Sequence, residues 1–192
     1  MSKTVLVIWS GGRNKIGYIK ALCELGARVV VLDPIEESWG AEKVFPNIPG
    51  VTCSFKEKEK VLSEAKRLNA QFHFDEVDTI FERALEMAAD IRLALGLPGP
   101  SPAAIEIGRR KSLMLELMEA CQIRHAPSFV FGANDSHQKV LDWARNLKND
   151  KWILRPDRAG GKVGVFIFEG LSNFASALTT AQSDTINNPY AP

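Results

Sequence analysis

The sequence predicts an α/β fold whose N-terminal part contains a parallel sheet. Short apolar runs of strand length alternate with segments in which apolar residues recur every three or four positions, as on one face of a helix. After their first residues the first two strands are continuously apolar, which is typical of parallel strands covered by helices on both faces. With 192 residues, of which 45% are hydrophobic, the chain is long enough to bury such a core.

The chain opens with a strand-helix-strand unit. We expect a strand from Thr4 to Trp9, which ends at the turn Ser10-Gly11-Gly12. A helix follows from Asn14 to Leu25, and Gly26 supplies its C-terminal stop. The second strand, Arg28 to Leu32, is again apolar on both faces. The unit therefore places a glycine-rich turn directly after the first strand.

A second run of alternating elements follows a looser stretch from Glu36 to Pro49. The expected elements are a strand at Val51–Phe55, a helix from Lys56 to Leu68, a strand from His73 to Phe81 and a helix from Glu82 to Leu95. The segment from Leu95 to Pro102 is the densest in glycine and proline, so we expect a domain boundary there. The first predicted domain comprises residues 1–97.

The rest of the chain is predicted to form a helical linker over residues 98–126 and a second lobe over residues 127–192. The expected elements are a helix from Lys111 to Cys121, a strand at Ser128–Phe131, a helix from Ser136 to Leu147, strands at Trp152–Arg155 and Val163–Phe168, and a last helix from Ser172 to Gln182. Asn134 or Asp135 is the expected N-cap of the helix that begins at Ser136.

Composition excludes several classes of protein. Lys and Arg number 24 against 23 Asp and Glu, a formal net charge of +1, so we expect no general attraction to nucleic acid or to anionic membranes. No apolar run approaches the roughly 20 residues that a membrane helix needs. The three cysteines lie far apart and outside any C-x-x-C pair, which argues against a disulfide framework or a zinc site. A cytoplasmic protein is the expectation.

The strongest local signal is the glycine-rich loop between the last two strands. Gly160, Gly161 and Gly164 carry no side chains, so backbone N–H groups there can close over an anion. Arg155, Arg158 and Lys162 add positive charge at the same place. The alternative interpretation is an ordinary hairpin whose glycines satisfy turn geometry and whose cations face solvent.

Two further clusters could bind anions or nucleotides. Arg109-Arg110-Lys111 opens a helix, where a lysine is unfavourable against the helix dipole unless an anion lies nearby; the alternative is a solvated charged face. Gly11, Gly12 and Arg13 follow the first strand, where open parallel sheets bind ligands. Asp33, about 20 residues later, resembles the ribose-binding acid of a dinucleotide fold. The G-x-G-x-x-G fingerprint is absent, so a nicotinamide cofactor is the weaker alternative.

Taken in order, these segments resemble the N-terminal portion of the ATP-grasp superfamily. Val5–Arg13 and Leu25–Asp33 are similar to the α/β domain that precedes the nucleotide-binding part of these enzymes. Phe74–Glu82 resembles the stretch that joins the two parts. Arg110-Lys111 with its helix, and Trp152–Val165 with its glycine-rich loop, resemble the small ATP-grasp lobe. The resemblance covers essentially the whole chain through the order and spacing of its segments.

The resemblance implies an ATP-dependent ligase. Such an enzyme phosphorylates a small, amino-acid-like carboxylate with ATP and lets an amine attack the acylphosphate; a biotin-carboxylase-like activity is the nearest alternative within the family. Lys111 matches the first phosphate-contacting lysine, and Arg155 stands where the family usually has a second lysine. The expected nucleotide-binding residues are completed by the loop that folds over the triphosphate, namely Gly160, Gly161, Lys162 and Gly164.

The resemblance also implies substrate-binding residues and a departure from the family. Glu82 matches a carboxylate that faces the substrate in amino-acid ligases, and the expected substrate site also includes Gly11, Gly12 and Arg13. In the family a second lobe supplies the side chains that bind Mg²⁺. The chain stops at Pro192, before such a lobe, so we expect its Mg²⁺ ligands to lie elsewhere and the chain alone to be inactive. The alternative is a non-catalytic nucleotide-binding or regulatory protein of this fold, which senses nucleotide or pairs with a full-length paralogue. The expected macromolecular partner is a second copy of the chain or, for the enzyme, a complementing chain.

Overall fold

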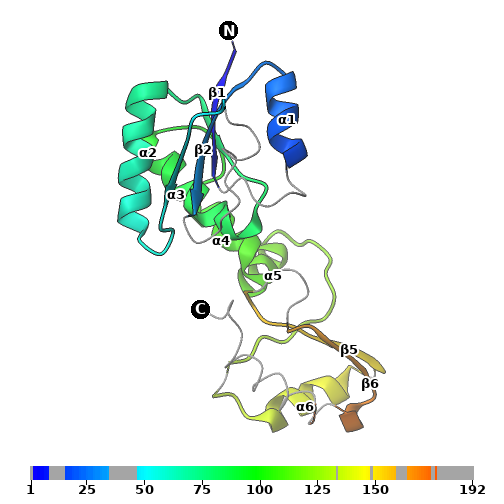
Figure 1. Cartoon of the computed structure of the whole chain (residues 1–192). Coiled ribbons are helices and arrows are strands. Elements are labelled where there is room, and N and C mark those ends of the chain that lie inside the picture. Colours follow the sequence, from blue (N-terminus) through cyan, green and yellow to red (C-terminus); the bar gives the residue numbers. More distant parts are fainter. Residues whose placement is uncertain are drawn as a thin grey trace. The chain divides into compact units, whose positions relative to one another are not determined.

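The computed structural model describes residues 2–8, 16–34, 47–132, 134–147, 149–158, 164–173 and 176. The chain forms two compact units, Met1–Glu106 and Ile107–Pro192, and each is considered by itself (Figure 1). The finer division into residues 1–97, 98–126 and 127–192 stays a prediction.

The first unit is built on a four-stranded parallel sheet with strand order β3-β2-β1-β4. Its strands are β1 (Thr4–Ile8), β2 (Arg28–Pro34), β3 (Gly50–Cys53) and β4 (Glu76–Asp78). Helix α1 (Ile16–Glu24) lies on one face of the sheet, and α2 (Lys58–Phe72) and α3 (Leu85–Leu95) lie on the other (Figure 1). The predicted α/β class and parallel sheet are confirmed.

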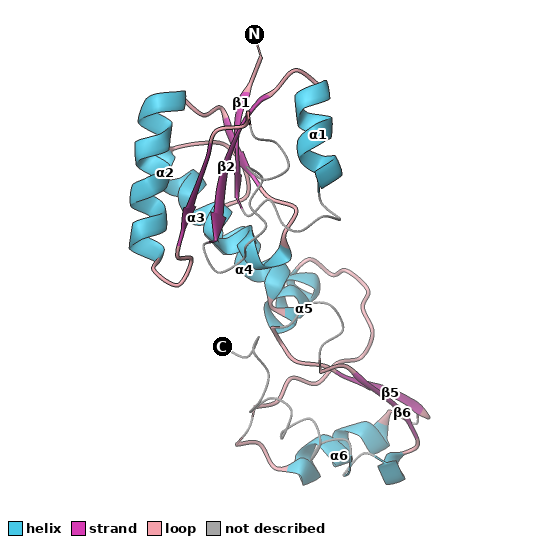
Figure 2. Ribbon diagram, viewed as in Figure 1, coloured by secondary structure: helices cyan, strands magenta, loops and turns pink. Residues whose placement is uncertain are grey.

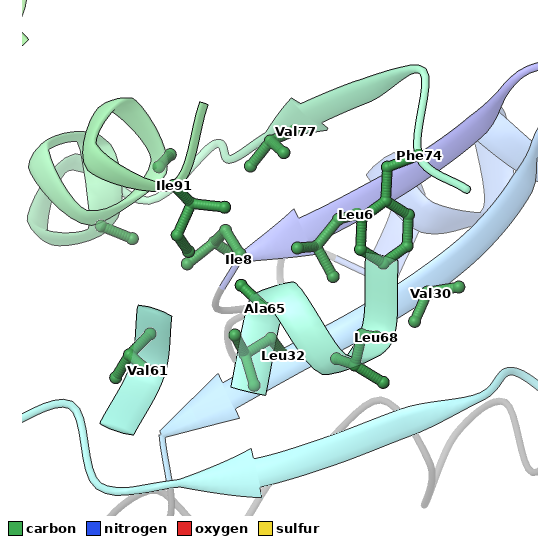
Figure 3. Close-up of a cluster of buried hydrophobic side chains, with 12 residues drawn as sticks. Leu6, Ile8, Val30, Leu32, Val61, Ala65, Leu68, Phe74, Val77 and Ile91 are labelled. Carbon is green, nitrogen blue, oxygen red and sulfur yellow. The ribbon is translucent and has the colours of Figure 1, made fainter. Parts of the chain in front are cut away.

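Buried side chains alternate between the two faces of this sheet, because successive strand residues point in opposite directions. Leu6 and Ile8 of β1 pack in the cluster that α2 and α3 complete (Figure 3). Val5 and Val7 face the other way, toward Ile19 of α1. Every residue of β1 is buried, so the strand needs apolar side chains on both faces, as its sequence shows.

The second unit contains an antiparallel hairpin and helices. β5 (Lys151–Leu154) pairs with β6 (Phe166–Glu169), drawn as paired magenta arrows in Figure 2. The helices are α5 (Lys111–Ala120), α6 (His137–Asn146) and the short η4 (Leu171–Asn173), while α4 (Pro102–Arg109) spans the boundary between the units. Val140 of α6 packs with Leu154, and the Trp143 and Trp152 rings meet edge to face with centroids 5.9 Å apart. No described helix is both long and apolar enough to cross a bilayer.

The structure corrects two predictions near α6. The segment Ser128–Phe131 is not a strand, although Phe129 and Phe131 pack against the α6 cluster as the alternation predicts. Alternation fixes which side chains share a face, but a strand also needs a backbone partner, and none of the described strands pairs with this segment. The N-cap of α6 is Ser136, whose hydroxyl accepts the Lys139 N–H, and not Asn134 or Asp135.

Other boundaries shift by smaller amounts. The expected strand His73–Phe81 shortens to β4, and the helix expected from Glu82 opens with a 3₁₀ turn, η3 (Glu82–Ala84). The predicted linker contains one helix more than expected, α4, ahead of α5. Of the last predicted helix, Ser172 and Asn173 lie in η4, whereas residues 174, 175 and 177–182 lie outside the described residues.

Candidate functional site

One face of the β5–β6 hairpin exposes a pair of isoleucines. Ile153 and Ile167 lie directly opposite each other in the strand register and are 65% and 73% exposed. Strand alternation turns their neighbours Trp152 and Leu154 toward α6 instead. Arg155 is also exposed and follows β5 directly, two residues beyond Ile153. The hairpin therefore exposes an apolar pair on its strands and a cation where the glycine-rich loop begins.

The two ends of that loop meet at Pro156 and Gly164. Gly164 has a φ of 67°, and a Cβ atom built on it would lie 2.8 Å from Cγ of Pro156. A side chain at this position would therefore be strained by its backbone and would also clash with the proline ring. Pro156 and Gly164 close the loop root, just beyond the last ladder pair, Leu154 and Phe166.

Asp157 joins the loop root to the start of α5. Its Oδ1 accepts the backbone N–H of Ser112 at 2.7 Å, and its Oδ2 accepts the Ser112 hydroxyl and the Arg110 Nε–H, each at 3.0 Å. Its backbone carbonyl accepts both the N–H and the Nζ of Lys111, each at 3.1 Å. Arg110, the N-cap of α5, makes no side-chain cap hydrogen bond, so Asp157 supplies the cap from a distant part of the chain.

The Asp157 carboxylate is held in its charged form. Partial burial acts to raise its pKa, but the N–H of Ser112, the Arg110 guanidinium and the Ser112 hydroxyl outweigh burial, so the pKa lies below its ordinary value. The start of α5 thus has an anion beside it, which pairs with Arg110 and accepts the N–H of Ser112, while Lys111 contacts the uncharged carbonyl of the same residue. Arg110 and Lys111 are engaged with Asp157 and are not merely solvated.

The structure brings together three of the residues singled out in the sequence. Lys111, Arg155 and Gly164 all lie at or next to the root of one loop in the second unit. Glu82 is exposed at the start of η3 in the first unit, and the two units are not placed relative to each other. Six further candidates lie outside the described residues: Gly11, Gly12, Arg13, Gly160, Gly161 and Lys162.

A second polar cluster lies at the carboxyl end of β4 in the first unit. The Tyr18 hydroxyl donates to Asp78 Oδ2, and Asp78 Oδ1 accepts the N–H of Thr79 at 2.8 Å. Arg92 of α3 is buried, donates from Nε to the Val77 carbonyl at 2.8 Å, and places Nη2 3.7 Å from Asp78 Oδ1. Burial and the bond to Asp78 raise the pKa of Tyr18, so its phenol stays neutral.

Comparison with solved structures identifies the fold. An L-amino acid ligase from Bacillus licheniformis superposes with a TM-score of 0.68 at 20% identity over 97% of this chain. The biotin carboxylase domain of a Hydrogenobacter thermophilus 2-oxoglutarate carboxylase, in complex with MgADP and bicarbonate, superposes with a TM-score of 0.71 at 19% identity over 99% of this chain. A carboxyaminoimidazole ribonucleotide synthase from Aspergillus clavatus, complexed with ATP, superposes with a TM-score of 0.70 at 21% identity over 94% of this chain. This chain has the fold of the N-terminal portion of ATP-grasp enzymes.

The chain spans 43%, 42% and 45% of the length of those three ATP-grasp structures, respectively. Comparison of the sequence with protein-family models found no match, and comparison with curated proteins found none either. The ATP-grasp fold is therefore established here through three-dimensional structure, at identities too low to carry substrate or activity across.

Four residues of the second unit that the structure places at this site were not predicted from the sequence. Ile153 and Ile167 could have been found, because a strand that buries Trp152 on one face must present its neighbours on the other. Asp157 and Ser112 carried no local signal, since their contact joins positions 45 residues apart.

Proposed function

We propose that this chain is the N-terminal part of an ATP-dependent ligase and that its second unit binds the nucleotide. The parent reaction we propose activates a small, amino-acid-like carboxylate as an acylphosphate, which an amine then attacks. Support for the general kind of enzyme comes from the shared fold, because the similar structures include an L-amino acid ligase and enzymes crystallised with ATP or MgADP.

The observation that carries the proposal is the outward face of the β5–β6 hairpin. An exposed pair of isoleucines is a platform for the flat, apolar surface of a base, and burying it on a ligand removes apolar area from water. Arg155 and Lys111 lie at the loop end of the same hairpin, where a triphosphate attached to that base would need neutralisation. Apolar surface beside clustered cations matches the two halves of a nucleotide.

The chemical role of each cation follows from its shape. Lys111 offers a point charge with three donors, which suits a phosphate oxygen approached from any side. Arg155 offers a planar fork that can bind two oxygens of one phosphate at once. In phosphoryl transfer such groups position the phosphates and neutralise developing charge. We further propose that backbone N–H groups of Gly160, Gly161 and Gly164, together with Lys162, complete the phosphate contacts.

Two other parts of the proposal concern substrate and metal. We propose Glu82, with Gly11, Gly12 and Arg13, as contacts for the carboxylate substrate. Mg²⁺ would supply additional neutralisation of the phosphates when bound. In the described ranges no group of three His, Cys, Asp or Glu side chains could hold a metal ion, so we assign no Mg²⁺ ligand there.

The test is a calorimetric titration of the 192-residue chain with ATP in the presence of Mg²⁺. We expect binding in the micromolar range for the unmodified chain. Substituting Lys111→Met and Arg155→Met together should weaken binding by about 100-fold or more, because charge-assisted hydrogen bonds each contribute about tenfold or more. Lys139→Met is the matched control, since this exposed lysine of α6 pairs with Asp135 at 3.2 Å, and we expect it to leave affinity unchanged.

A second pair of variants tests the apolar platform. Ile153→Ser should weaken ATP binding by about 5- to 30-fold through lost apolar contact with the base. Val130→Ser removes an apolar side chain of similar exposure, 59%, that lies off the hairpin, and it should change little. No ATP binding by the unmodified chain, or equal binding by the lysine–arginine double variant, would contradict the proposal. The expectation that the chain alone does not turn ATP over stays a prediction, checked by phosphate release in the same samples.

A further inference from the structure

Asp157 connects the two parts of the second unit that carry the proposed phosphate-binding cations. Arg155 lies two residues before it in the loop root, and Lys111 lies at the start of α5. The carboxylate accepts hydrogen bonds from Ser112 and Arg110 at the helix start, while the carbonyl of the same residue accepts one from the Lys111 ammonium. One residue thus fixes both where the helix begins and where its lysine points.

We infer that Asp157 is a positioning residue for phosphate recognition, which holds the Lys111 ammonium at the root of the glycine-rich loop before nucleotide arrives. This inference rests on the nucleotide-binding function proposed above. Lysine is among the side chains that lose most conformational freedom when ordered, so an ammonium that is already anchored has less to lose on binding. The hydrogen bond at 3.1 Å from Lys111 Nζ to the Asp157 carbonyl is that anchor.

The carboxylate and the carbonyl have separate tasks in this arrangement. The carbonyl contacts Lys111 directly, but its place depends on the carboxylate, which ties the loop root to the helix through three hydrogen bonds. The negative charge of Asp157 does not simply compete with phosphate, because it is paired with Arg110 and with the N-terminus of α5. The Asp157 carboxylate is already paired at the helix start. The Lys111 ammonium donates to an uncharged carbonyl, so it can donate to a phosphate oxygen as well.

Asp157→Asn is the direct test, since the amide keeps the shape of the side chain. Its oxygen can still accept one N–H, but its NH₂ group cannot accept from the Arg110 guanidinium or the Ser112 hydroxyl. We expect ATP affinity to fall by about 5- to 30-fold, and the affinity for adenosine to stay the same, because adenosine uses only the isoleucine platform. Backbone amide shifts measured by NMR during each titration report both affinities, including a weak one for adenosine.

Two variants make the result specific. Asp142→Asn removes a carboxylate of α6 that is 58% exposed and pairs with Arg145, so it measures the general effect of losing one negative charge, and we expect ATP binding unchanged or slightly tighter. Ser112→Ala removes only the hydroxyl bond to Asp157 Oδ2, without any change of charge, and should weaken ATP binding by about two- to fivefold with adenosine unaffected. If Asp157→Asn does not fold, as judged by its NMR spectrum, the Ser112→Ala result decides.

Each outcome bears on the inference. Weaker ATP binding with unchanged adenosine binding supports it. Equal loss for both ligands overturns it, because Asp157 would then only stabilise the unit, and tighter ATP binding overturns it as well, because Asp157 would then be a competing anion. Unchanged ATP binding in Asp157→Asn overturns the inference alone, whereas a lack of ATP binding by the unmodified chain overturns the proposed function together with it.

Discussion

Single residues at the loop root are constrained by backbone geometry as much as by chemistry. Gly164 was singled out in the sequence as part of an anion-binding loop, and the structure adds a reason that applies without any ligand. Its φ of 67° and the closeness of Pro156 leave no room for a side chain. Asp157 likewise has a structural task, because its carboxylate accepts the Ser112 N–H at the start of α5.

Gly164→Ala should destabilise the hairpin by about 1–3 kcal/mol, since the new methyl group meets both the left-handed backbone and the proline ring. Hydrogen exchange of the β5 and β6 amides measures this loss locally. Gly108→Ala is the matched control, because Gly108 lies in α4 with no atom within 4 Å of the built Cβ, and it should be neutral or stabilising by up to about 1 kcal/mol. Equal protection of the hairpin in both variants would refute the constraint.

The helices of the second unit begin in two different ways. α6 is capped within its own segment, where the Ser136 hydroxyl accepts the Lys139 N–H at 3.2 Å. The N-cap of α5 is Arg110, whose side chain makes no cap bond, and the N–H groups of Lys111 and Ser112 are satisfied by Asp157 instead. The first kind of cap can be found by sequence inspection to within a residue or two, whereas the second depends on which loop packs nearby.

Ser136→Ala should destabilise α6 by about 1 kcal/mol, because the Lys139 N–H loses its acceptor at the helix start. Ser136→Asp should restore the loss, since aspartate caps as well as serine and its charge suits the N-terminal end of the helix. Chemical denaturation monitored through the Trp143 side chain of α6, for instance by its indole NMR signal, reports both changes. An alanine variant as stable as the aspartate variant would show that the cap contributes nothing.

At the scale of the whole first unit, stability depends on a sheet that is covered on both faces. The cluster against α2 and α3 includes Leu6, Leu32 and Ile91, each 0% exposed, and the opposite face is closed by α1 through Ile19. A central strand contributes to both clusters at once, so a cavity in β1 should cost more than one at the margin of the unit.

Leu6→Ala should lower the free energy of unfolding by about 3–5 kcal/mol, because Leu6 is fully buried in the centre of the sheet. Leu25→Ala makes the same chemical change at a residue that is 84% exposed, and it should stay within about 0.5 kcal/mol of the unmodified chain. Urea unfolding followed by circular dichroism compares the two. Similar losses from both variants would mean that β1 is not the centre of the core.

The sequence by itself determined the α/β class and the parallel sheet, together with most helices. The spacing of apolar residues that predicts these elements depends only on residues close together in the chain. The apolar run of β1 after Thr4 predicts a strand covered on both sides, and the strand at β5 follows from equally local signals. Ser128–Phe131 shows the limit of such local signals. Its alternation correctly predicted which side chains pack together, but the predicted strand was wrong, because none of the described strands pairs with this segment.

Only the tertiary structure decided how the candidate site is assembled. Lys111 and Arg155 could be named from the sequence, but what holds Lys111 at the loop root is Asp157, 46 residues further along the chain. The exposed pair of Ile153 and Ile167 likewise depends on α6 covering the opposite face of the hairpin. The physical reason is common to both: local sequence sets backbone periodicity, whereas the partners of polar and apolar side chains are chosen by packing between distant segments.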